Sequence, residues 1–265
     1  MRSSIRLNNG VEMPMIGFGT YQIPASKTAR CVADALSVGY RLIDTAQCYG
    51  NEKEVGEAVC ASGLQREDIF ITTKLWGTNG YGDSLVSIEK SLKRLGTYID
   101  LLLIHEPTGN YHEIYHAMEK VHAEGKVRSI GVANFIGKTF IDLADNCEII
   151  PAVNQIETHV FRQQDRMRKL LADYGTVLQS WSPLACGQNG IFRNPILKKI
   201  ADNHDKTIAQ VVLRWLIQRG IPIIPKSTHK ERMEENIQIF YFVLSEAEMK
   251  MIANLDLDRS MFNWW

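Results

Sequence analysis

Short apolar runs alternate with longer segments of helical periodicity along most of the chain. The runs recur about every 25–30 residues, the size of one strand–helix unit, except for a wider gap before the last run. This alternation predicts a strand at each run. The eight expected strands are residues 15–19, 41–44, 69–74, 99–105, 127–133, 151–155, 176–181 and 221–225.

Amphipathic segments with apolar residues at helical spacing lie between these runs. The expected helices include residues 25–38, 82–95 and 111–124, with 195–204 and 207–219 in the wide gap. Residues 4–14 are expected to form a hairpin, because Asn8-Asn9-Gly10 supplies residues that accept the positive φ of a tight turn.

Eight alternating units predict a parallel sheet, and a count of eight favours closure into a TIM (β/α)8 barrel, here with an N-terminal β-hairpin. An open doubly wound sheet would instead carry a G-x-G-x-x-G after its first strand. Gly17-Phe-Gly-Thr20 lacks the third glycine and leads toward Pro24 rather than directly into a helix. The length of 265 residues fits one barrel without a low-complexity linker, so we expect residues 1–265 to form a single α/β domain.

Charge and cysteine content narrow the partners and the compartment. Lys+Arg and Asp+Glu number 30 each, so we expect neither nucleic acid nor a membrane surface as a partner. The five cysteines form no C-x-x-C, which favours a reducing, cytoplasmic location without disulfides or a zinc site. The sequence contains no run of about 18 apolar residues, so no membrane-spanning helix is expected. No long apolar stripe demands a partner, so we expect a monomer.

Polar or amphipathic residues close most of the predicted strands. In a barrel the carboxyl ends of the strands meet at one mouth, where active sites lie. Tyr49, on the loop after the second strand, is near enough to share that mouth. The strand-end residues are Asp44, Lys74, His105, Asn134, Gln155, Trp181 and Lys226.

Four of these side chains form a consistent proton-donating group. A tyrosine is a poor acid near neutral pH, with an ordinary pKa of about 10. We expect the Lys74 ammonium to lower the pKa of Tyr49 and Asp44 to pair with Lys74. His105 would orient the substrate oxygen or assist proton transfer. A purely structural ion-pair network is the alternative, and the placement at successive strand ends argues against it.

Short motifs that span nearly the whole chain can be compared with those of known families: Gly17-Phe-Gly-Thr20, Asp44-Thr-Ala46, Tyr49-Gly-Asn-Glu52, Thr73-Lys-Leu-Trp76, Leu103-Ile-His105, Gly131-Val-Ala-Asn-Phe135, Asn154-Gln155, Ser180-Trp-Ser-Pro-Leu184 and Pro225-Lys-Ser227. In these motifs and in their order the chain resembles the aldo-keto reductases, in particular the bacterial 2,5-diketo-D-gluconate reductase group. The resemblance implies NADPH-dependent reduction of aldehydes and ketones by an oxidoreductase acting on CH–OH groups, with Asp44, Tyr49, Lys74 and His105 as the catalytic residues.

The resemblance also implies a set of cofactor-binding residues. Asn134 and Gln155 would bind the carboxamide, and Trp181 would stack on the nicotinamide. Lys226 and Arg232 would provide cations for the 2′-phosphate of NADPH, since the loop after the eighth strand is a usual phosphate site in barrels. A solvated basic surface is the alternative for these two cations. The remaining implied residues are Gly19, Thr20, Ser182, Pro183, Leu184, Ser227, Glu235 and Asn236.

The substrate pocket departs from the family pattern. Glu106 stands where the family usually has tryptophan, Ala133 replaces a common serine, and Thr158 lies in an altered segment. The expected substrate-binding residues are Tyr21, Trp76 and His105, with a contribution from the C-terminal tryptophans. Trp76 as loop core and the tail as unstructured are the alternatives. A small or sugar-like carbonyl compound is the expected substrate.

Two other functions are alternatives to carbonyl reduction. Residues 112–116 read His-Glu-Ile-Tyr-His, which satisfies the H-E-x-x-H pattern of zinc proteases, but no third ligand is evident, so no metal is expected. A barrel that binds NADPH as a sensor without turnover is the second alternative, and the intact set of four candidate catalytic residues argues against it.

Overall fold

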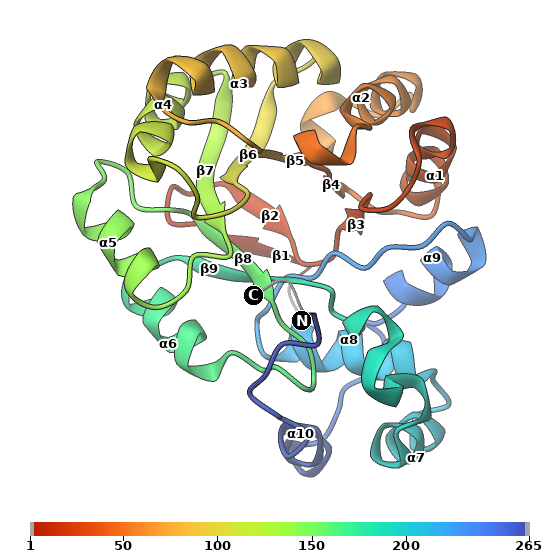
Figure 1. The fold of residues 1–265 in the computed structure, drawn as a ribbon. Helices are drawn as coiled ribbons and strands as arrows, with labels where there is room; N and C mark the ends of the chain where they lie inside the picture. The colour runs from red at the N-terminus through yellow and green to blue at the C-terminus, as the bar shows by residue number, and fades with distance from the viewer. Residues whose placement is uncertain (1–2, 263–265) are drawn as a thin grey trace.

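Parallel strands form the wall of a central barrel, and helices surround it (Figure 1). The computed structural model describes residues 3–262. Neighbouring strands in the sheet are also consecutive in sequence, as βαβ units require. This confirms the predicted (β/α)8 barrel fold. The strands are β3 Phe18–Gly19, β4 Leu42–Asp44, β5 Phe70–Leu75, β6 Ile99–Ile104, β7 Val127–Ala133, β8 Val153–Glu157 and β9 Val177–Trp181.

The eighth wall segment, residues 221–225, is not the regular strand that the sequence predicted. Only Ile223 forms bridges, one to Ile16 and one to Ser180. Backbone bonds nevertheless join the segment to both edges: Ser180 N donates to the Pro222 carbonyl at 2.8 Å, and Ile223 N donates to the Met15 carbonyl at 2.9 Å. Two prolines within the segment lack an N–H, which interrupts the ladder. The barrel is therefore closed by a few isolated bonds.

The predicted hairpin closes the end of the barrel opposite the mouth. Its strands, β1 Ser4–Arg6 and β2 Glu12–Pro14, are antiparallel, and Gly10 in the turn has φ +87°. Leu7 and Met13 of the hairpin belong to the same buried cluster as residues lining the barrel interior, including Leu101. Asn8 Nδ2 donates to the Ile150 carbonyl near the start of β8, which fixes the hairpin at the amino ends of the strands.

Helices cover the outside of the barrel and bury a second, larger apolar cluster against the strands. The five helices predicted from periodicity are present. Asn194 and Thr207 cap the two in the wide gap, and Thr207 does so in a capping box. Among residues 3–262, no helix has the length and apolar character needed to cross a bilayer. The helices are α1 Ala25–Ser37, α2 Glu52–Ala61, α3 Tyr81–Leu95, α4 Tyr111–Ala123, α5 Lys138–Asn146, α6 Asp165–Asp173, α7 Pro195–Asn203, α8 Ile208–Gln218, α9 Lys230–Ile237 and α10 Glu246–Ala253.

Candidate active site

The structure brings the four predicted catalytic residues together at the carboxyl ends of adjacent strands. Asp44 ends β4, Lys74 lies near the end of β5, and His105 directly follows β6. Tyr49 ends a short 3-10 helix, η1 Gln47–Tyr49, which folds back over the mouth after β4. Because parallel strands align their carboxyl ends, residues up to 61 positions apart in sequence become neighbours.

A buried ion pair lies at the centre of the site. Lys74 Nζ lies 2.5 Å from Asp44 Oδ1, and both side chains are almost fully buried. The ammonium also donates to the Thr45 carbonyl at 3.1 Å and to the Tyr49 hydroxyl at 3.4 Å. A lysine has three N–H donors, so each has an acceptor. Gln155 Nε2 donates to Asp44 Oδ2 at 2.7 Å, so both oxygens of the carboxylate are bound.

The expected lowering of the Tyr49 pKa by Lys74 is wrong. Burial raises the pKa of Tyr49 well above 10, and the Asp44 carboxylate raises it further. Asp44 lies closer to the ammonium than the phenol does, so the positive charge of Lys74 is largely compensated before it reaches Tyr49. Tyr49 is therefore a protonated phenol at neutral pH.

His105 is neutral in the same setting, because burial and then the charge of Lys74 lower its pKa to about 3. Its ring centroid lies 5.7 Å from that of Tyr49 and 5.1 Å from that of Trp76. Its Nδ1 lies 3.4 Å from Cys48 Sγ, a contact that no motif in the sequence predicts. A neutral imidazole carries one N–H, so this contact bears on which nitrogen faces the mouth as a donor.

Residues in and after β3, and Trp76 after β5, contribute to the site with different degrees of exposure. Only glycine fits at position 19, because a Cβ atom there would lie 2.9 Å from the Ile224 carbonyl oxygen of the closing segment. Thr20 is fully buried and its hydroxyl donates to the Asp44 carbonyl at 3.0 Å, which places it beneath the mouth. Tyr21 and Trp76, the expected substrate-binding aromatics, are 42% and 50% exposed at the rim.

A hydrogen-bonded chain crosses the mouth from β6 to β9. Asn134, which follows β7 with φ +64°, donates from Nδ2 to the His105 carbonyl at 3.1 Å and to Glu106 Oε1 at 2.9 Å. Its Oδ1 accepts from Trp181 Nε1 at 2.8 Å. Asn134 and Trp181, expected at the carboxamide and the nicotinamide, are thus joined to one another directly, and Asn134 also binds Glu106, which departs from the family pattern.

The expected adenosine-end residues lie beyond β9 and the closing segment. Lys226 and Arg232 are exposed and form no ion pair with any residue from 3 to 262. Ser227 and Asn236 are buried, while Glu235 accepts a hydrogen bond from Thr207 Oγ1 at 2.7 Å. The pyrophosphate candidates Ser182, Pro183 and Leu184 form the loop between β9 and η3 Ala185–Arg193.

A buried glutamate at the end of β8, missed in the sequence, fixes the C-terminal segment. Glu157 accepts hydrogen bonds from Ser260 Oγ at 2.7 Å and from Met261 N at 2.9 Å. Burial alone would raise its pKa, but hydrogen bonds, first that of His159, lower the pKa to about 2. Phe262 then packs on Trp181 with ring centroids 5.2 Å apart. The C-terminal tryptophans, residues 264 and 265, lie outside the described residues.

The H-E-x-x-H segment lies on α4, on the outside of the barrel. His112 Nε2 lies 2.7 Å from Asp142 Oδ2, whereas His116 Nδ1 lies 3.4 Å from Glu119 Oε2. The two imidazoles therefore contact different carboxylates. Within residues 3–262, no three His, Cys, Asp or Glu side chains are grouped so as to hold a metal ion.

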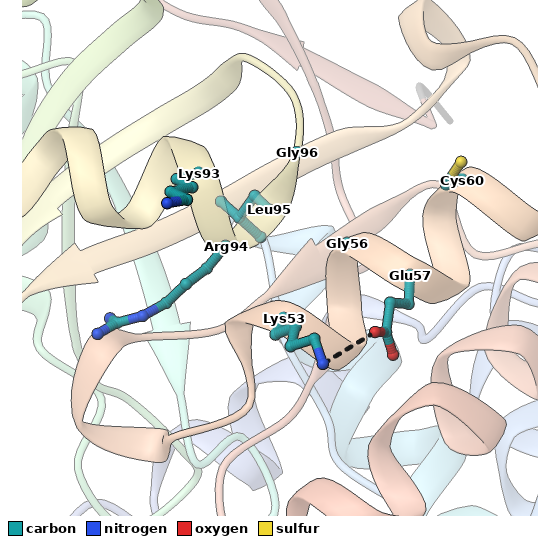
Figure 2. A pocket seen from close by; sticks show the side chains of 8 residues that line it. All are labelled: Lys53, Gly56, Glu57, Cys60, Lys93, Arg94, Leu95 and Gly96. Carbon is teal, nitrogen blue, oxygen red and sulfur yellow. Dashed lines mark ion pairs between the residues drawn. The ribbon is translucent and has the colours of Figure 1, made fainter.

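A surface pocket of about 480 Å³ lies between α2 and α3 and shares no residue with the mouth (Figure 2). Lys53 and Glu57 form an ion pair along α2 at its edge. The helices meet closely at Gly56, where a Cβ would lie 2.3 Å from the Leu95 carbonyl. The pocket is therefore a packing groove between helices that Gly56 brings together.

Comparison with known proteins agrees with this geometry. A sequence model described as "Aldo/keto reductase family" matches residues 15–257. The glyoxal reductase of Bacillus subtilis is 42% identical over 263 residues, covering 98% of this chain and 95% of that protein. Among solved structures, an aldo-keto reductase from a Medee basin deep-sea metagenome library aligns with a TM-score of 0.96 at 44% identity, covering 98% and 97% of the two chains. A Bombyx mori aldo-keto reductase in complex with NADP aligns with a TM-score of 0.93 at 32% identity, covering 98% and 95%.

Proposed function

Because the chain belongs to the aldo/keto reductase family, we propose that it reduces aldehydes or ketones to alcohols with NADPH and that Tyr49 donates the proton. One observation carries this proposal: the Lys74 ammonium lies between the Asp44 carboxylate and the Tyr49 hydroxyl, at the mouth of the barrel. A hydride acceptor bound there would have a phenol, a cation and a neutral imidazole around its oxygen.

The chemistry of the site follows from these groups. When bound, reduced nicotinamide would supply the hydride to the carbonyl carbon. Tyr49 holds its proton until then, because burial keeps its pKa high. An alkoxide is a stronger base than a phenolate, so the O–H bond of Tyr49 breaks and the proton passes to the substrate oxygen. Lys74 then stabilises the phenolate through their hydrogen bond, and solvent returns the proton.

Two features of the adenosine end fit NADPH. Lys226 and Arg232 form no ion pair within residues 3–262, so they offer charge for a phosphate group without first breaking such a pair there. Arg232 lies on α9, which follows the closing segment, where barrels often bind phosphate. The solved Bombyx mori relative was crystallised with NADP, which supports the same choice here.

Replacing Arg232 with alanine is expected to weaken NADPH binding by about 10–150-fold, the effect of one charge-assisted hydrogen bond of about 1.5–3 kcal/mol. NADH affinity should barely change, because NADH lacks the 2′-phosphate. Fluorescence titration with both cofactors measures this, and added salt should narrow the difference. Arg166→Ala on α6, which removes another exposed arginine, serves as the control. Equal losses for both cofactors would disprove the 2′-phosphate role.

Cys48 is proposed to position His105. Burial raises the pKa of the thiol, so it remains protonated and can donate to His105 Nδ1, which leaves the N–H on Nε2. Cys48→Ala should lower kcat about 2–10-fold, the range of one ordinary hydrogen bond, with NADPH affinity unchanged. Cys48→Ser keeps a donor and should restore activity. Nitrogen NMR of His105 reports the tautomer, and an unchanged tautomer in Cys48→Ala would contradict this role.

The direct test of the function is NADPH oxidation with aldehydes, ketones, dicarbonyls and keto sugars. The exposed aromatics Tyr21 and Trp76 leave the rim open to small carbonyl compounds, and the Bacillus subtilis relative is named a glyoxal reductase. Turnover with at least one class is the expected result. Cofactor binding without any turnover would favour a sensor, and stoichiometric zinc at His112 and His116 would favour the hydrolase alternative.

A further inference from the structure

Glu106 is a half-buried acid that forms no ion pair with a cation in the described part of the chain. Its Oε1 accepts from Asn134 Nδ2 at 2.9 Å, whereas its Oε2 is inaccessible and has no hydrogen-bond partner among residues 3–262. No lysine or arginine within residues 3–262 forms an ion pair with Glu106. An ionised carboxylate in such a place loses hydration without gaining a counter-charge. The neutral acid is therefore the favoured form.

The groups that face Glu106 reinforce this preference. Burial raises the pKa of Cys48 and of Tyr49 on η1, and a negative charge on Glu106 raises both pKa values further, so neither group offers Glu106 a counter-charge. His105, the preceding residue, is uncharged near neutral pH, and the Lys74 ammonium is held by Asp44. Burial raises the pKa of Glu106 to about 8, and the hydrogen bond from Asn134 offsets only part of that rise.

The acid is connected to the residues expected at the nicotinamide. Asn134 donates to Glu106 and to the His105 carbonyl, so its amide group has one orientation. That orientation turns Oδ1 toward Trp181 Nε1, 2.8 Å away. Glu106 thus orients the Trp181 ring indirectly, through Asn134. A change in its charge is felt directly at Asn134 and, through Asn134, at Trp181.

We propose that Glu106 is a positioning residue whose charge distinguishes the two oxidation states of the cofactor. As a neutral acid it holds Asn134 and Trp181 while the reduced, uncharged nicotinamide is bound. With oxidised cofactor, whose nicotinamide ring is a cation, Glu106 loses its proton to solvent and the carboxylate stabilises that ring. This rests on the proposed NADPH-dependent function, and it makes the ratio of the two cofactor affinities depend on pH.

The expected sign follows from linkage. The oxidised cofactor prefers ionised Glu106, so its dissociation constant should fall as pH rises through about 8, while that of NADPH should hold steady. At an effective dielectric constant of about 20, opposite charges within about 10 Å change an equilibrium constant by about tenfold. We therefore expect the ratio of the NADP⁺ to the NADPH dissociation constant to fall about tenfold across this range. The 2′-phosphate, with a second pKa of about 6, is common to both cofactors and cancels in the ratio.

The experiment measures both dissociation constants by titration from pH 6.5 to 9.5 in three variants. Glu106→Gln still accepts from Asn134 but cannot ionise, so it should bind both cofactors with a ratio that is flat in pH. Glu106→Leu loses the acceptor and should bind both about 2–10-fold more weakly. Glu57→Gln, which neutralises an exposed carboxylate on α2, should behave like the wild type.

A readout without cofactor tests the link to Trp181 separately. The chain has five tryptophans, and the difference between the wild type and Trp181→Phe isolates the fluorescence of Trp181. That fluorescence should change with a midpoint near pH 8 in the wild type and not in Glu106→Gln. A flat wild-type ratio, or a pH dependence that persists in Glu106→Gln, overturns the proposal while leaving cofactor binding intact. Failure to bind either cofactor would instead overturn the proposed function, and the fluorescence would still decide the link.

Discussion

Replacing Tyr49 with phenylalanine is expected to lower kcat for carbonyl reduction by about 10²–10⁴, the usual contribution of a positioned general acid. The substitution removes the one hydroxyl that accepts from the Lys74 ammonium and has a proton to give. NADPH affinity should be nearly unchanged, because the 2′-phosphate is expected to bind Lys226 and Arg232, in the loop and helix that follow the closing segment, and not Tyr49. Steady-state reduction rates and cofactor titration measure the two quantities separately.

The control for this variant is Tyr241→Phe, which removes a phenol that is 86% exposed on the outer surface. It should retain wild-type turnover and stability. Near-wild-type turnover in Tyr49→Phe would assign the proton to another group, such as His105, whose ring centroid lies 5.7 Å from that of Tyr49. A weakened cofactor affinity in the same variant would instead indicate that the ring of Tyr49 supports the binding site.

Replacing Lys74 with methionine is expected to lower the free energy of unfolding by about 3–5 kcal/mol, because it leaves a buried carboxylate without its counter-charge. Asp44 would keep the hydrogen bond from Gln155 but would lose the ammonium 2.5 Å away. Reduction should also fall, since no cation would remain to stabilise the Tyr49 phenolate. Denaturant unfolding measures the stability, and steady-state kinetics measure the rate.

A double variant separates the two roles of Lys74. Adding Asp44→Asn to Lys74→Met removes the stranded charge, so much of the lost stability should return while activity remains low. Recovery of both would mean that the charge of Lys74 acts only on Asp44. Wild-type stability in the single Lys74→Met variant would contradict the buried-pair interpretation.

The fold was accessible from sequence because its elements are local and periodic. β7 has the predicted bounds of residues 127–133, since an apolar run between polar loops determines a buried parallel strand. The run at 221–225 looks the same in one dimension. Its prolines interrupt hydrogen bonding with β9 and with the segment before β3. The pattern of apolar and polar residues carries no information about a missing N–H, so it does not distinguish this segment from a regular strand.

The sequence predicts which residues lie at the candidate site better than it predicts their pKa values and contacts. The proximity of Asp44, Lys74 and His105 could be predicted because the carboxyl ends of barrel strands converge whatever the conformation of the loops. The direction of the Tyr49 pKa was wrong, because the effect of burial exceeds that of a lysine already paired. The contacts of Cys48 and Glu157 depend on side-chain orientation between distant segments, and no spacing along the chain encodes them.

Synthesis from the amino terminus leaves one edge of the barrel open until most of the chain has been made. Strand β3 leaves the ribosome about 200 residues before Ile223, a delay of about 10–40 s at about 5–20 residues per second. Throughout that time the Met15 carbonyl and the Gly17 and Gly19 amides lack the partners that residues 223–225 later provide. An open edge is a template for pairing with other chains, and β3, two residues long, offers only a short one. The brevity of that strand thus protects the nascent protein during the interval before its barrel closes.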